Sequence, residues 1–256
     1  MGSDGRINPF SLEGKAVLVT GATSGIGRQC AIDCAMMGAR VVAIGRNAER
    51  LDEVVGEMGG RGKGFLFDLN DLDGIGTLIP QIVEQNGKMD GLIHAAGIEV
   101  TNPLKLSKHE DFESLYRVNC LSAFEIIKHL CGIKTFNKGG SIVLISSISG
   151  VIARKGLSAY AASKGALTSA ARVIASEMAS REIRVNTVSP GTILTPMMQK
   201  ALDAMSEDDK KKRISGFPLG LGKTTDISNA CIYLLSDASR WVTGQNLIVD
   251  GGYTSI

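Results

Sequence analysis

Tyr160 and Lys164 stand four residues apart in a segment, 157–180, whose apolar residues recur at helical spacing. This spacing places the two side chains next to each other on one face of a helix. An ammonium group near a phenol favours the phenolate and lowers the pKa of the tyrosine from its usual value of about 10. A tyrosine tuned in this way can act as a general acid or base. The pair therefore predicts a proton-transfer site, although the same spacing also occurs in inert surface pairs.

A glycine-rich turn, TGATSGIG at 20–27, follows an apolar run and opens the first segment with helical periodicity. Glycines allow a tight turn and let backbone N–H groups approach a pyrophosphate, and the helix N-terminus adds a favourable dipole. This position between strand and helix favours a dinucleotide site over a tight turn without a ligand.

The end of the second apolar run indicates which dinucleotide would bind. An acidic side chain there would hydrogen-bond the ribose 2′-hydroxyl of NAD(H), whereas a nearby basic one would accept the 2′-phosphate of NADP(H). The chain has Gly45 and Arg46 at this point, and a guanidinium suits phosphate well. We therefore predict that NADP(H) is preferred over NAD(H); the alternative for Arg46 is a solvated loop residue.

Apolar runs without polar alternation separate the segments with helical periodicity. Such runs are typical of strands covered on both faces, and repeated strand–helix units imply a parallel sheet with right-handed crossovers. Strands are expected at 15–20, 40–44, 64–67, 91–94, 141–146, 183–188 and 246–249. Helices are expected at 25–37, 48–58, 72–85, 108–136, 157–180 and 225–235.

The stretch 192–223 interrupts this alternation and holds a short charged segment, SEDDKKKR at 206–213. Its acids precede its bases by four residues, which is the favourable order on a solvated helix face. A surface helix and a lid over a site are both compatible with this pattern, whereas a basic patch for nucleic acid is not favoured. We expect 192–223 to be a substrate lid within a single domain at 12–256, preceded by an N-terminal arm at 1–11.

Composition limits the class of protein. The chain has 256 residues, of which 44% are hydrophobic and 21% charged, as expected for one soluble α/β domain. The net charge of +2 favours neither a nucleic-acid nor a membrane partner, and no apolar run approaches the roughly 20 residues of a membrane span. The polar start lacks an apolar signal segment, so we expect a cytoplasmic protein. Because the five cysteines and three histidines form no ligand motif, we expect no metal and reduced core cysteines.

Together with Asn119, Ser147 and Pro190-Gly191, these motifs make the chain closely similar to the classical short-chain dehydrogenase/reductase family over residues 12–256. The resemblance implies an α/β fold, namely a single-domain Rossmann fold. Its doubly wound parallel sheet would have seven strands in the order 3-2-1-4-5-6-7, with helices on both faces. The resemblance also implies hydride transfer between NAD(P)(H) and a ketone or secondary alcohol.

The resemblance further implies a catalytic tetrad of Asn119, Ser147, Tyr160 and Lys164. In such enzymes the tyrosine gives a proton to the substrate carbonyl oxygen during reduction, and Ser147 would hold that oxygen by a hydrogen bond. Lys164 would bind the nicotinamide ribose and tune Tyr160, while Asn119 would hold a water that relays protons to Lys164. The serine is chosen among its neighbours because it precedes Tyr160 by thirteen residues.

The cofactor contacts are likewise carried over from the family. Asp68 and Leu69 would meet the adenine, and Ile193 and Thr195 the nicotinamide carboxamide. Residues 94–97 (HAAG) replace the family's Asn-Asn-Ala-Gly, so both asparagine side chains are lost and His94 is interpreted as a packed core histidine. The implied cofactor-binding residues are Gly21, Thr23, Ser24, Gly25, Ile26, Gly27, Arg46, Asp68, Leu69, Ala95, Ala96, Gly97, Tyr160, Lys164, Pro190, Gly191, Ile193 and Thr195.

The overall pattern looks most like 3-oxoacyl-[acyl-carrier-protein] reductases, which implies a ketone carried on acyl-carrier protein. Arg181 and, more loosely, Lys138 fall where such enzymes meet the acidic carrier protein, and solvated surface charge is the alternative. A sterol, sugar or polyol dehydrogenase would use the same tetrad. A non-catalytic cofactor-sensing scaffold is disfavoured because such proteins lose the tyrosine or the lysine. The C-terminal signature of the family implies a homotetramer.

Overall fold

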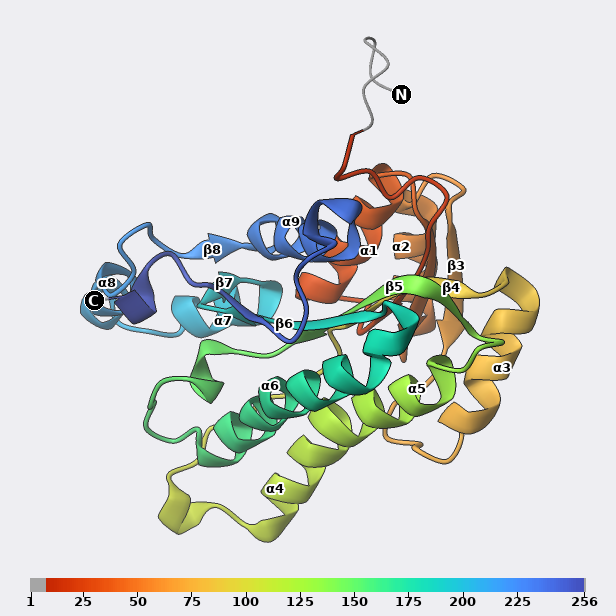
Figure 1. Ribbon diagram of the computed structural model, residues 1–256. Helices are drawn as coiled ribbons and strands as arrows, with labels where there is room; N and C mark the ends of the chain where they lie inside the picture. Colours follow the sequence, from red (N-terminus) through yellow and green to blue (C-terminus); the bar gives the residue numbers. More distant parts are fainter. Residues whose placement is uncertain (1–7, 256) are drawn as a thin grey trace.

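A parallel sheet of seven strands forms the centre of the molecule (Figure 1). The computed structural model describes residues 8–255. The strands follow the order β3-β2-β1-β4-β5-β6-β9, so the expected order is confirmed, with β9 as the seventh strand. Their bounds are β1 Ala16–Thr20, β2 Arg40–Gly45, β3 Gly62–Leu66, β4 Met89–His94, β5 Phe136–Ile145, β6 Arg184–Pro190 and β9 Asn246–Val249. Two short strands, β7 Ile193–Leu194 and β8 Gly222–Lys223, pair with each other outside this sheet.

Helices cover both faces of the sheet (Figure 1). On one face lie α1 Gly25–Met36, α2 Ala48–Glu57 and α9 Thr224–Leu235. On the other face lie α3 Ile75–Asn86, α4 His109–Tyr116, α5 Ser122–Leu130 and α6 Ser158–Met178. The expected lid region holds α7 Pro196–Asp203 and α8 Glu207–Ser215. None of the helices within residues 8–255 is long and apolar enough to cross a bilayer.

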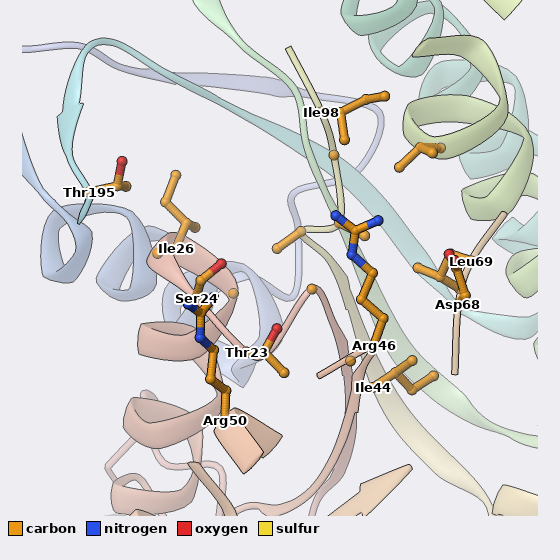
Figure 2. Close-up of a pocket in the computed structure, with 18 of the residues that line it drawn as sticks. Thr23, Ser24, Ile26, Ile44, Arg46, Arg50, Asp68, Leu69, Ile98 and Thr195 are labelled. Atoms are coloured by element: carbon orange, nitrogen blue, oxygen red, sulfur yellow. The ribbon is translucent and has the colours of Figure 1, made fainter. Parts of the chain in front are cut away.

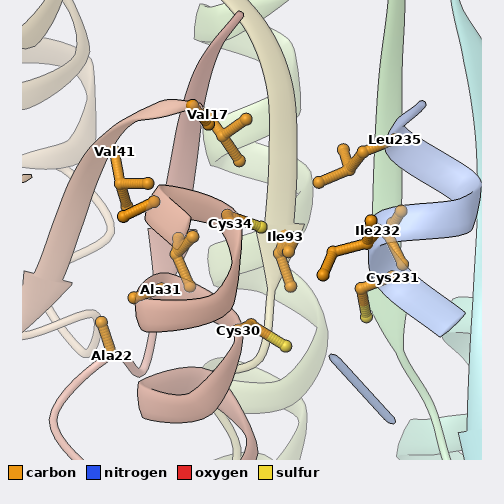
Figure 3. Packing of buried hydrophobic residues seen from close by; sticks show 14 of the residues in the cluster. Val17, Ala22, Cys30, Ala31, Cys34, Val41, Ile93, Cys231, Ile232 and Leu235 are labelled. Atoms are coloured by element: carbon orange, nitrogen blue, oxygen red, sulfur yellow. The ribbon is translucent and has the colours of Figure 1, made fainter. Parts of the chain in front are cut away.

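The alternation of side chains along each strand divides the interior into two hydrophobic cores. In β1, Val17 and Val19 face one core while Leu18 faces the other, and all three are fully buried. Each such side chain stabilises the fold by about 1.5–3 kcal/mol relative to an exposed one. The first core contains Cys30 and Cys231, drawn in Figure 3 between α1 and α9. A hydrogen bond with Cys231, together with burial, raises the pKa of the Cys30 thiol well above its usual range.

The expected helix at 108–136 is wrong in extent, because the segment contains two helices and the start of a strand. A π-helical turn, Arg117–Leu121, joins α4 to α5, and the helical part ends at Leu130. The Thr135 hydroxyl donates a hydrogen bond to the Leu130 carbonyl at 2.5 Å and so satisfies one of the orphan groups at the helix end. Phe136 is fully buried and pairs with Met89 as the first residue of β5.

Helices α3 and α7 also differ from the sequence expectation. Helix α3 begins at Ile75, because the Asp71 carboxylate accepts a hydrogen bond from the Gly74 backbone N–H at 3.0 Å and holds a turn ahead of the helix. Helix α7 was not expected at all. Its start has a clear local cause, since the Thr195 hydroxyl accepts from Met198 N–H at 3.2 Å and a proline follows the cap.

The chain packs on the domain from its first described residues onward. Residues 1–7 of the expected N-terminal arm lie outside the described part of the chain. The carbonyl of Pro9 accepts a hydrogen bond from Ala238 N–H at 3.0 Å, and the ring of Phe10 lies 6.3 Å from that of Tyr233. Leu12 is fully buried in the first core. These contacts join the start of the described chain to the region around α9.

Candidate active site

The glycine-rich turn lies where the order of strands in the sheet reverses. β1 pairs with both β2 and β4, so Thr20 and His94 end adjacent strands at the carboxyl edge of the sheet. In open α/β sheets, the crevice beyond this edge is where ligands bind. The fold therefore brings the turn at 20–27 together with residues 95–97, although some seventy residues separate the two segments in the sequence.

Glycine is required at two positions of this turn. Gly21 has φ +65°, and a Cβ there would lie 2.8 Å from both Cα and N of Ala96. A Cβ on Gly27 would lie 2.3 Å from the carbonyl oxygen of Gly21. Since both obstacles are backbone atoms, no rotamer change can relieve them. This close packing sets the N-terminus of α1 directly above the end of β1, as a pyrophosphate cradle requires.

A cavity of about 670 Å³ opens beside this turn (Figure 2). Most of the expected cofactor-binding residues line it, namely Gly21, Thr23, Ser24, Gly25, Ile26, Gly27, Arg46, Asp68, Leu69, Ala95, Ala96, Gly97 and Thr195. The expected contacts that are not part of its lining are Tyr160, Lys164, Pro190, Gly191 and Ile193. The cavity combines a backbone cradle, a helix N-terminus and basic side chains, and this combination fits a dinucleotide. The residues that line the cavity are the ones that would hold the dinucleotide.

The end of β2 lies beside the glycine-rich turn. A Cβ on Gly45 would lie 2.2 Å from Cγ2 of Thr23, so an acidic side chain cannot occupy this position unless Thr23 moves. The next residue, Arg46, is exposed and lines the cavity. Sequence reasoning missed Arg50, a second arginine in the lining, which Figure 2 shows pointing toward Ser24. Its place in the first turn of α2, four residues after Arg46, is the signal that could have found it.

Asp68 follows β3 on the opposite side of the cavity from Ser24 (Figure 2). Hydrogen bonds from Asn70 lower the pKa of its carboxyl, and the charge of Arg46 lowers it further. The backbone N–H of Asn70 donates to Asp68 Oδ1 at 3.0 Å and the side-chain amide at 2.9 Å. The carboxylate is therefore ionised and fixed in place beside the arginine expected to select NADP(H).

Asn119 and Lys164 converge on Gly97, at the inner end of this region. A Cβ on Gly97 would lie 3.2 Å from both Asn119 Oδ1 and Lys164 Nζ. Asn119 is fully buried in the π-helical turn, a feature that frequently marks functional sites. Its amide group accepts from Ile98 N–H at 2.8 Å and donates to the carbonyl of Ile98 at 3.1 Å. The backbone after β4 thus holds this side chain in one orientation.

Lys164 is an ammonium group removed from water. Its side chain is 4% exposed, and Nζ donates a hydrogen bond to the carbonyl of Ile145 at 2.8 Å, where β5 ends. Burial lowers the pKa of Lys164 to about 8, because the charged form is disfavoured away from water. Nζ lies 5.8 Å from the centre of the Tyr160 ring, so the two side chains are neighbours on α6 as the i,i+4 spacing predicts.

Tyr160 shows a shift opposite to the one expected from its neighbour. Burial raises the pKa of Tyr160 to about 12, and the charge of Glu99 raises it further, while a hydrogen bond with Ser147 opposes the shift. The expectation that Lys164 lowers this pKa is therefore wrong for the described structure. The reason is that desolvation disfavours the phenolate and is the largest contribution to the shift. The phenol is consequently protonated at neutral pH and available as a donor.

Ser147 lies at the end of β5, in the short turn before α6. It is 9% exposed, and its hydroxyl oxygen accepts from Ser149 N–H at 3.1 Å. The neighbouring Ser146 is 3% exposed and donates to the Lys164 carbonyl at 2.8 Å, so its hydroxyl serves to tie β5 to α6. The Ser146 hydroxyl is thus bound to the Lys164 carbonyl, whereas the Ser147 hydroxyl forms a hydrogen bond with Tyr160.

His94 is a buried core residue, as interpreted from the sequence. It is fully buried, and its Nδ1 lies 3.1 Å from Thr20 Oγ1, which itself accepts from Ala96 N–H at 3.2 Å. The Thr20 hydroxyl and Nδ1 thus share one hydrogen bond. Burial lowers the pKa of His94 to about 3, with the charge of Lys164 contributing. The imidazole is neutral and links β1 to β4.

The segment after β6 packs on the same edge of the sheet. Gly191 N–H donates to the Val249 carbonyl at 2.9 Å, and a Cβ on Gly191 would lie 2.8 Å from Cα of Asp250. Ile193 is 7% exposed, so only its backbone can face a ligand. Thr195 caps α7 and its methyl group faces Gly25, where an added Cβ would be 3.3 Å away. Contacts from 190–193 to a cofactor stay a prediction.

The two basic residues expected to meet a carrier protein both have internal partners. The guanidinium of Arg181 donates to the carbonyls of Cys131 and Phe136, the latter at 2.6 Å. Lys138 forms an ion pair with Glu182 at 2.7 Å. The arginine therefore holds the end of α5 and the start of β5 against the end of α6. This structural role weakens the expectation that these residues bind an acidic partner.

The comparisons with known proteins agree on one family, but the related proteins are named for different substrates. The family model described as enoyl-(acyl carrier protein) reductase matches residues 21–254. The chain is 36% identical to the 3-oxoacyl-[acyl-carrier-protein] reductase of Thermotoga maritima, over 94% of this chain and 98% of that one. It is 34% identical to the D-threitol dehydrogenase of Mycolicibacterium smegmatis, over 96% and 95% of the two chains.

Solved structures agree on the fold. A structure described as an NAD(P)-dependent gluconate 5-dehydrogenase from Beutenbergia cavernae, with bound NADP, superposes with a TM-score of 0.88 at 32% identity. The alignment covers 97% of this chain and all of that one. A structure described as a gluconate dehydrogenase from Agrobacterium tumefaciens superposes with a TM-score of 0.90 at 29% identity, over 98% and 100% of the two chains.

Proposed function

Because the chain belongs to the short-chain dehydrogenase/reductase family, and so is an NAD(P)-dependent oxidoreductase, we propose that it interconverts a ketone and a secondary alcohol with NADP(H). The observation that carries the proposal is the convergence of Asn119, Lys164 and Gly97 at the inner end of the dinucleotide cavity. A dinucleotide in that cavity supplies the hydride, and the protein positions the substrate against it.

In the proposed mechanism, Tyr160 gives its proton to the carbonyl oxygen while negative charge grows there. Its raised pKa keeps the phenol protonated at neutral pH, as a donor requires. The Ser147 hydroxyl donates a second hydrogen bond to the same oxygen, which stabilises the transition state more than the ground state. Lys164 then returns a proton to Tyr160, and a water held by Asn119 would replace the proton on Lys164. In the oxidation direction, each of these transfers runs in reverse.

We propose NADP(H) over NAD(H) on the basis of the end of β2. A side chain at position 45 would meet the side chain of Thr23, and Arg46 and Arg50 both line the cavity. Guanidinium groups in the lining suit the additional phosphate of NADP(H).

Replacing Arg46 with alanine is expected to weaken NADPH binding far more than NADH binding. A charge-assisted hydrogen bond is worth about 1.5–3 kcal/mol, so the dissociation constant for NADPH should rise about 10- to 100-fold. The measurement is titration of each cofactor into the wild-type and variant proteins, followed by fluorescence. An equal loss of affinity for both cofactors would remove Arg46 from the 2′-phosphate site.

Two substrate classes follow from the relatives. A 3-oxoacyl group on acyl-carrier protein is proposed from the relatives that carry that name. A small polyol or sugar derivative is the second candidate, because one relative is a D-threitol dehydrogenase and because Arg181 and Lys138 have internal partners.

The proposed function is tested by titrating NADPH and NADH and then assaying a panel of ketones that includes acetoacetyl thioester, sugar ketones and oxo acids. Tight NADPH binding with turnover of any ketone supports the reaction. Preference for the thioester supports the first substrate class, and preference for the small polar ketones supports the second. Binding of neither dinucleotide would rule out the proposal and favour a scaffold.

We also propose that the chain forms a homotetramer, as its family resemblance implies. Two observations support self-association. The side chains of Trp241 and Leu219 are 90% and 86% exposed. A second cavity between α5 and α6 is lined by apolar groups, including Phe124, Val173 and Met178. Exposed apolar surface of this kind marks interaction sites.

A further inference from the structure

Ser163 is a fully buried serine within α6, and it stands between Tyr160 and Lys164 in the sequence. Its hydroxyl donates a hydrogen bond to the carbonyl of Tyr160 at 2.8 Å. A serine inside a helix often makes such a bond to the preceding turn, so this bond alone describes a structural residue. Ser163 is not among the residues that line the dinucleotide cavity. Any part that it plays in the reaction must therefore act through another residue.

The hydroxyl of Ser163 also contacts Asn119, which comes from the π-helical turn 44 residues earlier in the chain. Asn119 Nδ2 lies 3.0 Å from Ser163 Oγ, and both side chains are fully buried. A serine hydroxyl has a single proton, and here that proton is donated to the carbonyl of Tyr160. The oxygen can therefore only accept from Asn119, which requires that the amide group turn its NH₂ toward α6.

This contact uses the last free proton of the Asn119 amide group. An asparagine side chain has two N–H donors and an oxygen with two lone pairs. One N–H is donated to the carbonyl of Ile98 at 3.1 Å and the other to Ser163, while Oδ1 accepts from Ile98 N–H at 2.8 Å. A Cβ on Gly97 would lie 3.2 Å from Oδ1 and 3.2 Å from Lys164 Nζ. With its NH₂ held by Ile98 and Ser163, the amide thus keeps its oxygen on the side of the lysine.

A second bond joins the π-helical turn to the same residue of α6. Cys120 is fully buried, and its Sγ donates to the carbonyl of Ser163 at 2.9 Å. Asn119 and Cys120 are consecutive, so the turn binds Ser163 at both its hydroxyl and its carbonyl. The next residue of α6 is Lys164. Ser163 therefore couples the position of Asn119 to that of the lysine.

We propose that Ser163 is a positioning residue for the reaction. Its hydroxyl holds the Asn119 amide beside Lys164, so the return of a proton to Tyr160 through the lysine depends on this serine. Without the hydroxyl, a buried N–H of Asn119 would lose its acceptor, which is costly, and the amide would turn or shift to find another. The inference rests on the proposed ketone–alcohol reaction and adds to it a residue outside the cofactor cavity.

The first test compares Ser163→Ala with the control Ser236→Ala. Ser236 is also fully buried and also donates to the carbonyl three residues before it, that of Tyr233, at 2.9 Å, but it lies at the end of α9. With the best ketone of the panel, Ser163→Ala should lower kcat about 10-fold or more, because a displacement of about 1 Å can cost about 100-fold in rate. KM and the NADPH dissociation constant should change less than about twofold, since substrate and cofactor contacts are kept.

Ser236→Ala should keep the wild-type kcat, because it removes the same kind of helical hydrogen bond away from the candidate site. Wild-type kcat in Ser163→Ala would overturn the proposal. An equal loss of kcat in both variants would also overturn it, because the serine would then act only on the stability of its helix.

A double-mutant cycle tests whether Ser163 acts through Asn119. The kcat values of Ser163→Ala, Asn119→Ala and the double variant are measured per NADPH-binding site, so that unfolded protein is not counted. If the serine acts through the amide, the double variant should have the kcat of Asn119→Ala within about twofold. The losses in melting temperature should likewise sum to more than the loss in the double variant, a readout that needs no turnover. Losses of kcat that multiply would show two independent roles and would overturn the proposal.

Turnover by the wild-type protein separates failure of this inference from failure of the proposed function. If wild type reduces a ketone and Ser163→Ala does so equally well, only the positioning role is wrong. If wild type binds NADPH but reduces no ketone of the panel, the proposed reaction fails and the positioning role fails with it.

Discussion

Replacing Tyr160 with phenylalanine is expected to abolish most turnover while leaving NADPH affinity unchanged. The substitution removes only the hydroxyl, which is the proton donor at the carbonyl oxygen, and it keeps the ring that packs beside Lys164. General acid catalysis contributes about 100- to 10,000-fold in rate, and a loss of this size is expected in kcat. Because the contact with the oxygen strengthens in the transition state, KM should change little.

The control for this experiment is Tyr233→Phe. Tyr233 lies in α9, where its ring contacts Phe10, and the substitution removes the same hydroxyl outside the candidate site. Its turnover and its melting temperature should match those of the wild-type protein. Steady-state kinetics on the best ketone of the panel, with NADPH titration by fluorescence, provide both readouts. Full turnover by Tyr160→Phe would show that another group donates the proton and would remove Tyr160 from its assigned role.

Replacing Gly27 with alanine is expected to remove most cofactor affinity. The new Cβ would lie 2.3 Å from the carbonyl oxygen of Gly21, so α1 must move away from the turn that follows β1. Because the N–H groups at the start of α1 would then miss the pyrophosphate, the NADPH dissociation constant should rise at least about 100-fold, or roughly 2.7 kcal/mol. Forcing a methyl group against backbone should also cost about 1–3 kcal/mol of stability.

Gly56→Ala is the matched control for this substitution. Gly56 lies within α2, and an added Cβ there meets nothing within 4 Å. The change should leave NADPH affinity intact and stabilise the protein by about 0.4–1 kcal/mol, since alanine favours the helix and restricts the unfolded chain. Thermal unfolding and NADPH titration of both variants give the comparison. Wild-type affinity in Gly27→Ala would mean that the turn does not carry the pyrophosphate.

The sequence by itself determined the strand–helix alternation, the glycine-rich turn and the candidate residues Tyr160 and Lys164, whereas the strand order came from the family resemblance. Unbroken apolar runs and helical periodicity are local signals, and a glycine turn between strand and helix is a signal in adjacent residues. The i,i+4 spacing in α6 is equally local, so the neighbouring positions of Tyr160 and Lys164 follow from the helix alone. The family resemblance then supplied Asn119 and Ser147. No local pattern reveals these two residues, because they lie outside the segment that holds Tyr160 and Lys164.

Only the tertiary structure decided the electrostatics and the contacts between distant segments. Burial raises the pKa of Tyr160, against the expectation from Lys164, because desolvation depends on the packed surroundings and not on spacing. The expected helix at 108–136 ends early because Phe136 finds its place in β5 beside Met89, a contact that no local pattern encodes.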